Sequence, residues 1–326
     1  MSSEFSLLNF PDIVMKMILR NLDFVSIQCL RKTSRDLRNF IDDVKPESKM
    51  TEFQLEFGDS CIKFLPKFDD KKDMLIRYQK APNGGCFIST DQWKNQKYLP
   101  NSNFLNLAFN DFQTFLNFSN SGIFEEIEMD FDTSDSESEN FSKDLFDRIS
   151  KTKSFPLKAK SFRIFYNSKS PILNILPLID SGKLEELEFH GLKKGLDFSE
   201  ISKMDQWKSA KTLQISNFVK NVPVGSLIHF NLIKMDLFEV SLEMILSLKE
   251  AFLRSPHMMN YEISFRKSDA EEHLVELFGE DFELESFWYF GIPDDLENVI
   301  SFGFGSNFIV FERILRNIVP IGARIL

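Results

Sequence analysis

Cysteine and histidine are scarce in this sequence. Its 326 residues contain three cysteines and four histidines: Cys29, Cys61, Cys86, His190, His229, His257 and His273. The cysteines are odd in number and have no metal-binding spacing, which indicates reduced thiols in an intracellular protein. The histidines are scattered, and none has a ligand partner at helical or hairpin spacing. We therefore expect neither a disulfide framework nor a metal site.

Phosphate-binding and membrane signals are also missing. The chain has no G-x-x-x-x-G-K-S/T and no G-x-G-x-x-G string, no apolar run of about 18 residues, and no basic start followed by a long apolar stretch. Cys86 follows Gly84 and Gly85, but no family signature supplies a base, so this string predicts a hairpin turn before a strand rather than a nucleophile. We expect no cofactor, no catalytic residue and no enzyme.

Positive charge is in short supply. The chain has 39 Lys and Arg against 49 Asp and Glu, a net charge of −10. Such a surface repels phosphate backbones and anionic lipids, so neither nucleic acid nor a membrane is an expected partner. The sequence indicates an intracellular protein and leaves the choice between cytoplasm and nucleus open.

Phenylalanine is the abundant residue, with 36 copies against 5 tyrosines and 3 tryptophans. These side chains have no polar group, so most must lie in a core or at an interface. Hydrophobic residues make up 43% of the chain and charged residues 27%, which is typical of a folded protein.

The N-terminal segment, residues 5–48, predicts three short helices. Pro11 stands where a helix would begin, Asn21 can end it, and Ser34 can cap the third helix. Apolar residues recur at helical spacing in all three. A unit this small cannot bury all of that surface by itself, so the surplus must meet a partner or the rest of the chain. The pattern alone fits two roles for these helices equally well: a cap on the larger domain, or a unit that docks on a partner.

The next segment changes period. Residues 52–57, Glu-Phe-Gln-Leu-Glu-Phe, alternate polar and apolar side chains, which predicts a half-buried strand. Further strands are expected at residues 62–65, 74–78 and 86–88, and Pro82-Asn83-Gly84-Gly85 predicts a turn. We expect a short antiparallel β segment.

Beyond residue 100 the chain repeats a helix followed by a short strand. The expected strands are residues 127–129, 162–165, 184–189, 212–216, 230–235 and 260–265, and the expected helices are residues 143–150, 172–180 and 242–255. Several spacings fit a leucine-rich-like repeat, in which strands line a concave face.

The acidic run from Asp132 to Asn140 predicts a solvated loop, where Ser134 and Ser136 are candidate phosphorylation sites. The glycines near Gly303 are expected to bend a strand.

Two strings resemble known domains. Leu7-x-x-Phe10-Pro11, the apolar helix up to Leu22-Asp23 and the run LRKTSRDLRNFIDD resemble an F-box of the nematode F-box A family. Ile13 replaces the usual acidic residue and Leu37 the common tryptophan. Downstream, Asp205-Gln206-Trp207-Lys208 and Leu277-Phe278-Gly279 resemble the FTH domain, the usual partner of this F-box.

The resemblance implies a non-catalytic receptor. Its F-box is expected to bind a Skp-family adaptor, and through it a cullin, while the FTH domain binds an unknown target protein for ubiquitination. The residues expected to form the adaptor interface and its supporting core are Leu8, Pro11, Ile13, Val14, Ile18, Leu22, Leu30 and Leu37. Two alternatives stay open: an F-box-like scaffold that acts without degradation, and an unrecognised enzyme with a deep pocket.

The expected fold class is therefore α+β. Residues 1–48 form the three-helix F-box, residues 49–100 an antiparallel β connecting segment, and residues 101–326 an FTH-like α/β repeat domain in the form of a curved solenoid.

Overall fold

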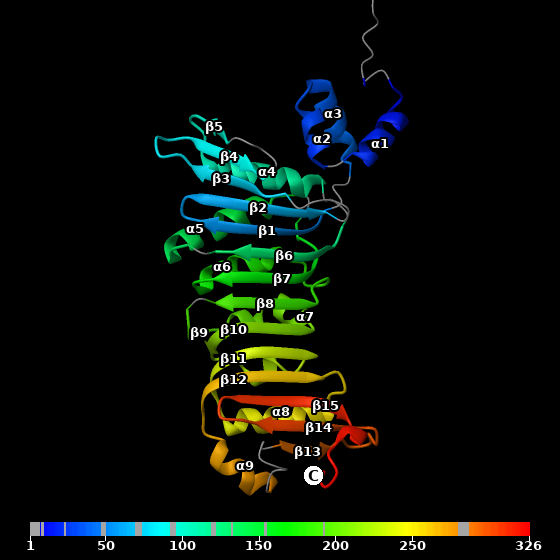
Figure 1. Cartoon of the computed structure of the whole chain (residues 1–326), viewed down its shortest axis with the longest axis vertical. Coiled ribbons are helices and arrows are strands. Elements are labelled where there is room, and N and C mark those ends of the chain that lie inside the picture. Colours follow the sequence, from blue (N-terminus) through cyan, green and yellow to red (C-terminus); the bar gives the residue numbers. More distant parts are fainter. Residues whose placement is uncertain are drawn as a thin grey trace, which may run out of the picture.

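The computed structural model describes residues 7, 10–22, 24–46, 50–68, 74–91, 96–118, 122–131, 133–152, 155–191, 193–279 and 287–326. They form three N-terminal helices and one 15-stranded sheet covered by further helices (Figure 1). The N-terminal helices lie at one end of the elongated molecule and the C-terminus at the other (Figure 1). The coarse part of the expected α+β class, N-terminal helices followed by a large region of mixed helices and strands, is confirmed.

The three N-terminal helices begin and end close to where the sequence predicts. They are α1 (Asp12–Asn21), α2 (Phe24–Arg31) and α3 (Arg35–Val44). Pro11 is the residue before α1, and the Ser34 side chain accepts a hydrogen bond from the backbone N–H of Leu37 at 3.2 Å. This cap satisfies one of the donors that a helix N-terminus leaves free.

Seven neighbouring strands of the sheet run parallel. In spatial order they are β1 (Met50–Gly58), β6 (Phe124–Asp130), β7 (Ala159–Tyr166), β8 (Glu186–Gly191), β10 (Thr212–Lys220), β11 (Leu232–Val240) and β12 (Asn260–Ser268). The two-residue strand β9 (Leu196–Asp197) pairs with β10. Because β1 pairs directly with β6, the segment after the N-terminal helices belongs to the same sheet as the repeats.

Antiparallel strands extend the sheet at both ends. One end has β2 (Cys61–Phe68), β3 (Ile76–Lys80), β4 (Cys86–Thr90) and β5 (Lys97–Leu99). The other end has β15 (Phe308–Leu315), β14 (Asn298–Phe304) and β13 (Phe287–Gly291). The antiparallel segment expected from residues 51–90 is confirmed, and the Gly84-Gly85 pair forms its hairpin turn at φ of +85° and +84°.

Helices cover one face of the sheet. They are α4 (Phe104–Phe118), α5 (Asp135–Ile149), α6 (Lys169–Ile175), α7 (Asp205–Ser209), α8 (Leu242–Arg254) and α9 (Glu271–Phe278), with 3₁₀ turns at Leu176–Leu178, Ile201–Lys203, Val224–Ser226 and Arg316–Ile318. The phenylalanines fill the space beneath them: Phe112 of α4 meets Phe53 of β1 with ring centroids 5.1 Å apart. No helix in the described part of the chain is long and apolar enough to cross a membrane.

One sequence prediction is wrong. The run after Asp132 is not a solvated loop, because α5 begins at Asp135 and Ser138 is fully buried. Phe141, Leu145 and Ile149 recur every four residues and anchor this helix in the core, which outweighs the polar composition of its first turns. The bend expected near Gly303 stays a prediction; Gly303 lies within β14, and a Cβ there would lie 2.6 Å from the Phe287 ring, so the glycine makes room for that ring.

Candidate adaptor-binding and target-binding surfaces

The outer side of α1 exposes apolar side chains. Ile13 is 70% exposed, Met17 59%, and Phe10, just before the helix, 42%. Positions 13 and 17 share one side of the helix, since three or four residues make one turn, and Phe10 precedes the helix. The opposite side holds Met15 and Leu19 in the core. We call Phe10, Ile13 and Met17 the outer strip.

The eight expected adaptor-interface residues divide into two groups. Pro11 and Ile13 are exposed and Val14 and Ile18 are half-buried, so these four face outward from α1 or its edge. Leu22, Leu30 and Leu37 instead support the helices from inside. Leu8 lies outside the described residues. The prediction omitted Met17, which helical spacing places on the same side as Ile13, and Phe10, which lies before the helix.

The N-terminal helices are fixed to the sheet by an aromatic cluster. The Phe24 ring of α2 stacks on Phe115 of α4 with centroids 4.1 Å apart, and it also meets Phe118 and Phe68. Within the unit, Arg31 donates two hydrogen bonds, at 2.6 and 3.0 Å, to the carboxylate of Asp42. The surplus apolar surface noted in the sequence is thus shared: part packs on the rest of the chain, and the outer strip stays exposed.

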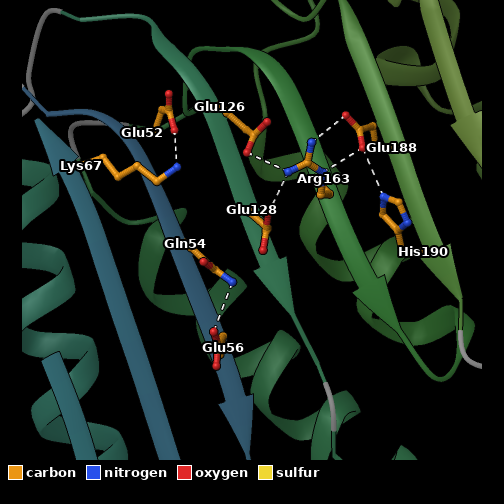
Figure 2. A network of polar contacts seen from close by, with 9 residues as sticks. All are labelled: Glu52, Gln54, Glu56, Lys67, Glu126, Glu128, Arg163, Glu188 and His190. Carbon is orange, nitrogen blue, oxygen red and sulfur yellow. Dashed lines mark hydrogen bonds and ion pairs between the residues drawn. The ribbon is translucent and has the colours of Figure 1, made fainter. Parts of the chain in front are cut away.

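The other face of the sheet is charged and has no helix among the described residues. Figure 2 shows its side chains on the near side of β1, β6, β7 and β8, with the helices behind the sheet. Carboxylates dominate it, and we call the following set the acidic face: Glu52, Glu56, Glu126, Glu128, Glu186 and Glu188.

Arg163 of β7 is the central cation of the acidic face. Its Nε and Nη2 donate to the two carboxylate oxygens of Glu188 at 2.8 and 2.9 Å, and its Nη1 donates to Glu126 and Glu128 at 3.0 Å each (Figure 2). Three carboxylates from two neighbouring strands therefore share one guanidinium. Such bidentate charge-assisted bonds are the strong ones of their kind.

Two further cations that pair with the acidic face lie on β2. Lys67 pairs with Glu52 at 2.7 Å, and Lys63 pairs with Glu56, which also accepts a hydrogen bond from Gln54 at 3.2 Å. The imidazole of His190 lies 3.2 Å from Glu188 and stacks on Phe165. Five of the six carboxylates thus share three basic residues, Lys63, Lys67 and Arg163, and this set of side chains carries a surplus of negative charge.

The pKa values of these carboxyl groups move in opposite directions. The hydrogen bond from His190 and those from Arg163 lower the pKa of Glu188 to about 2. Burial raises the pKa of Glu126, and Arg163 offsets this only in part. Burial and the neighbouring Glu188 charge raise the pKa of Glu186. Close carboxylates without enough cations are expected to behave in this way.

The acidic face has no metal-binding geometry. In the portion of the chain that the structure describes, no three His, Cys, Asp or Glu side chains are grouped so that they could hold a metal ion. The carboxylates are spread along rows that cross the strands, which is an arrangement for several separate charges rather than one ion.

Two domain families match different parts of the chain. Residues 7–49, which include all three N-terminal helices, match the model of the F-box domain, and residues 139–281 match that of the FTH domain. The chain therefore carries an F-box followed by an FTH domain. F-box proteins generally act as substrate receptors of Skp–cullin–F-box ubiquitin ligases.

The particular resemblance to the nematode F-box A family is also confirmed. The chain is 26% identical over 290 residues to F-box A protein 224 of Caenorhabditis elegans, an alignment that covers 85% of this chain and 71% of the relative. No solved structure matches the chain. The FTH match contains Arg163 and Glu188 but not Glu126 or Glu128, so the acidic face extends across its boundary.

Proposed function

We propose that this chain is the substrate-recognition subunit of a Skp–cullin–F-box ubiquitin ligase. Residues 1–48 bind a Skp-family adaptor and, through it, a cullin. Residues 49–100 and 101–326, joined by the pairing of β1 with β6, hold a target protein. In this proposal the parallel strands and their crossovers act as a leucine-rich-like repeat that presents a broad surface. Ubiquitin transfer is promoted by proximity rather than by side-chain chemistry of this chain.

The outer strip is the observation that carries the proposal. Ile13 and Met17 are large apolar side chains that are more than half exposed, on a helix whose other side is already buried in the chain's own core. Adjacent exposed apolar residues on one helix side are typical of a protein-binding site. Pro11, Ile13, Val14 and Ile18 are the proposed contact residues, together with Phe10 and Met17, while Leu22, Leu30 and Leu37 hold the helices in place.

An adaptor-binding assay on the full chain tests this function. Removing the N-terminal helices would uncover Phe115 and Phe118, so point variants are the better choice. Ile13→Asp combined with Met17→Asp should weaken binding to a purified Skp-family adaptor at least about a hundredfold, because buried anchors carry most of an interface's free energy. Thermal unfolding should be unchanged, since both side chains point away from the core.

The matched control is Val275→Asp combined with Leu277→Asp on α9. These side chains are 49% and 53% exposed and lie at the opposite end of the molecule (Figure 1), so the same change in charge and polarity should leave adaptor binding intact. Equal binding by both double variants would show that the adaptor surface lies elsewhere.

The second candidate is a scaffold that binds the adaptor and a target without degradation. It makes the same prediction for the outer strip and differs downstream. A purified adaptor–receptor complex that recruits cullin and transfers ubiquitin to a bound target supports the ligase, whereas binding without transfer supports the scaffold.

A further inference from the structure

We propose that the acidic face is the docking site for a lysine- and arginine-rich segment of the target protein. The inference deepens the proposed function, because it names the chemistry of the target that such a receptor would hold. It rests on two rows of side chains that cross β6, β7 and β8.

The first row already has its cation. Glu128, Arg163 and Glu188 are consecutive partners in the register of the three strands, and Arg163 bonds to both carboxylates. Neighbouring strands lie about 4.8 Å apart, so a guanidinium on the middle strand reaches acids on either side.

The second row has the same acids without the cation. Glu126, Ser161 and Glu186 are register partners on the same three strands, two residues towards the amino ends, and Glu52 of β1 continues the row. Ser161 occupies the position that Arg163 holds in the first row. Glu126 shares the Nη1 atom of Arg163, and Glu186 has no ion pair among the described residues.

The middle of the second row contains an unsatisfied hydroxyl. Ser161 is only 9% exposed, and its Oγ atom has no hydrogen-bond partner. Its register partners Glu126 and Glu186 place its side chain on the open face between them. Buried polar groups are normally hydrogen-bonded, and an orphan needs a partner from outside. The Oγ atom has almost no accessible surface, so an external group reaches it only when neighbouring side chains turn aside. An ammonium or guanidinium group that did so could donate to the hydroxyl and to both carboxylates.

The electrostatics of the row favour the same occupant. Burial raises the pKa of both Glu126 and Glu186, and the carboxylate of Glu188 adds to the effect on each. A bound cation would relieve this repulsion. Phosphate-bearing partners would increase the repulsion. The acids are spread along the rows, and the described residues contain no metal-binding group, which favours a polypeptide with several separate positive charges.

The test uses the full chain and a fluorescently labelled peptide of alternating lysine and glycine, followed by anisotropy at low salt. Glu126→Gln combined with Glu186→Gln should weaken peptide binding about tenfold, as expected for the loss of two charge contacts. Ser161→Ala, which keeps every charge, should weaken it about threefold through the lost hydroxyl. The bidentate pair of Arg163 with Glu188 is left in place in both variants.

The matched control is Glu272→Gln combined with Glu276→Gln. Both residues are exposed on α9, and the double variant has the same net charge as the acidic-face variant. It should bind the peptide like the native chain. Equal weakening in the two double variants, no peptide binding by the native chain, or preferred binding of a labelled single-stranded oligonucleotide would each overturn the inference.

Adaptor binding by the same samples separates the inference from the function on which it rests. If the acidic-face variant binds adaptor normally and peptide weakly, both stand. If the native chain binds adaptor but not peptide, only the acidic-face inference fails. If the native chain binds peptide but no adaptor, the docking site stands and the ligase function fails.

Discussion

The two faces of the same sheet are buried by different means. On β8, Phe189 points to the helices and is fully buried, with its ring edge-on to Phe198 at 5.4 Å. Its neighbour Glu188 points to the open face and is only 8% exposed, although no helix of the described chain covers it. Neighbouring side chains, above all Arg163 and His190, enclose it.

A small exposed fraction therefore does not by itself tell whether a face of the sheet serves stability or binding. The helix face is stabilised by apolar packing, which depends little on pH or salt. The open face is stabilised by paired charges and strained by unpaired ones, so its stability and its binding both respond to protonation and ionic strength. The first face holds the sheet together, and the second is suited to recognition.

The largest expected effect is on the helix face. Phe189→Ala removes a ring enclosed by Phe198 and Trp207 and should lower the free energy of unfolding by about 3–5 kcal/mol, because the cavity collapses only in part. Urea titration followed by circular dichroism measures it. Phe308→Ala on β15, where the ring is 44% exposed, is the control and should cost about 1 kcal/mol or less. Equal losses would mean that the helix face is not the main source of stability.

An intermediate effect is expected for the paired acid of the open face. Glu188→Gln leaves Arg163 and His190 without their shared carboxylate and should cost about 2 kcal/mol at neutral pH. The folded-state pKa of about 2 lies below the unfolded value, so this contribution is present above about pH 4.5. It is lost as the pH falls towards 2.

The check is the pH dependence of the difference between native chain and Glu188→Gln. The gap in unfolding free energy should be full at pH 7 and should shrink steadily between about pH 4.5 and 2. Glu125→Gln is the control, since Glu125 pairs with Lys160 while both side chains are about half exposed, and it should show no such gap. A gap that stays constant down to pH 2 would assign the loss to packing instead of charge.

Local patterns in the sequence predicted many of the strands and helices, but not which strands lie side by side in the sheet. The alternation of residues 52–57 predicted both the strand and its polar side, and β1 confirms it. That Glu126, Glu128 and Glu188 meet at Arg163 depends on the order and register of β6, β7 and β8, which no local pattern contains. The acidic face therefore could not be assembled from the sequence.

Several elements were missed for identifiable reasons. In α4, buried phenylalanines at positions 104, 109, 112, 115 and 118 recur at helical spacing, and Asn106, Asn110 and Gln113 lie exposed on the other side, so this helix could have been predicted from the sequence. In α5, the helix expected at residues 143–150 is present, but the serines and acids of the preceding turns hid its first half, which begins at Asp135. Of the outer strip, only Ile13 was among the predicted interface residues, because helical spacing showed surplus apolar surface without telling which part the rest of the chain would cover.

The smallest expected change in the free energy of unfolding concerns Glu186, which has no ion pair among the described residues. This change has the opposite sign to the others. Burial and the Glu188 charge raise the pKa of Glu186, so its ionised form destabilises the folded state. Glu186→Gln should therefore raise the free energy of unfolding slightly at pH 7, by about 0.5 kcal/mol. Below the unfolded-state pKa of about 4.3 the Glu186 carboxyl is neutral in both the folded and the unfolded chain, so the gain in stability should vanish. Urea titrations of the native chain and the variant at pH 7 and pH 3.5 measure it. If Glu186→Gln instead costs as much as Glu188→Gln, every carboxylate of the open face is held by its own partner and the second row has no room for an external cation.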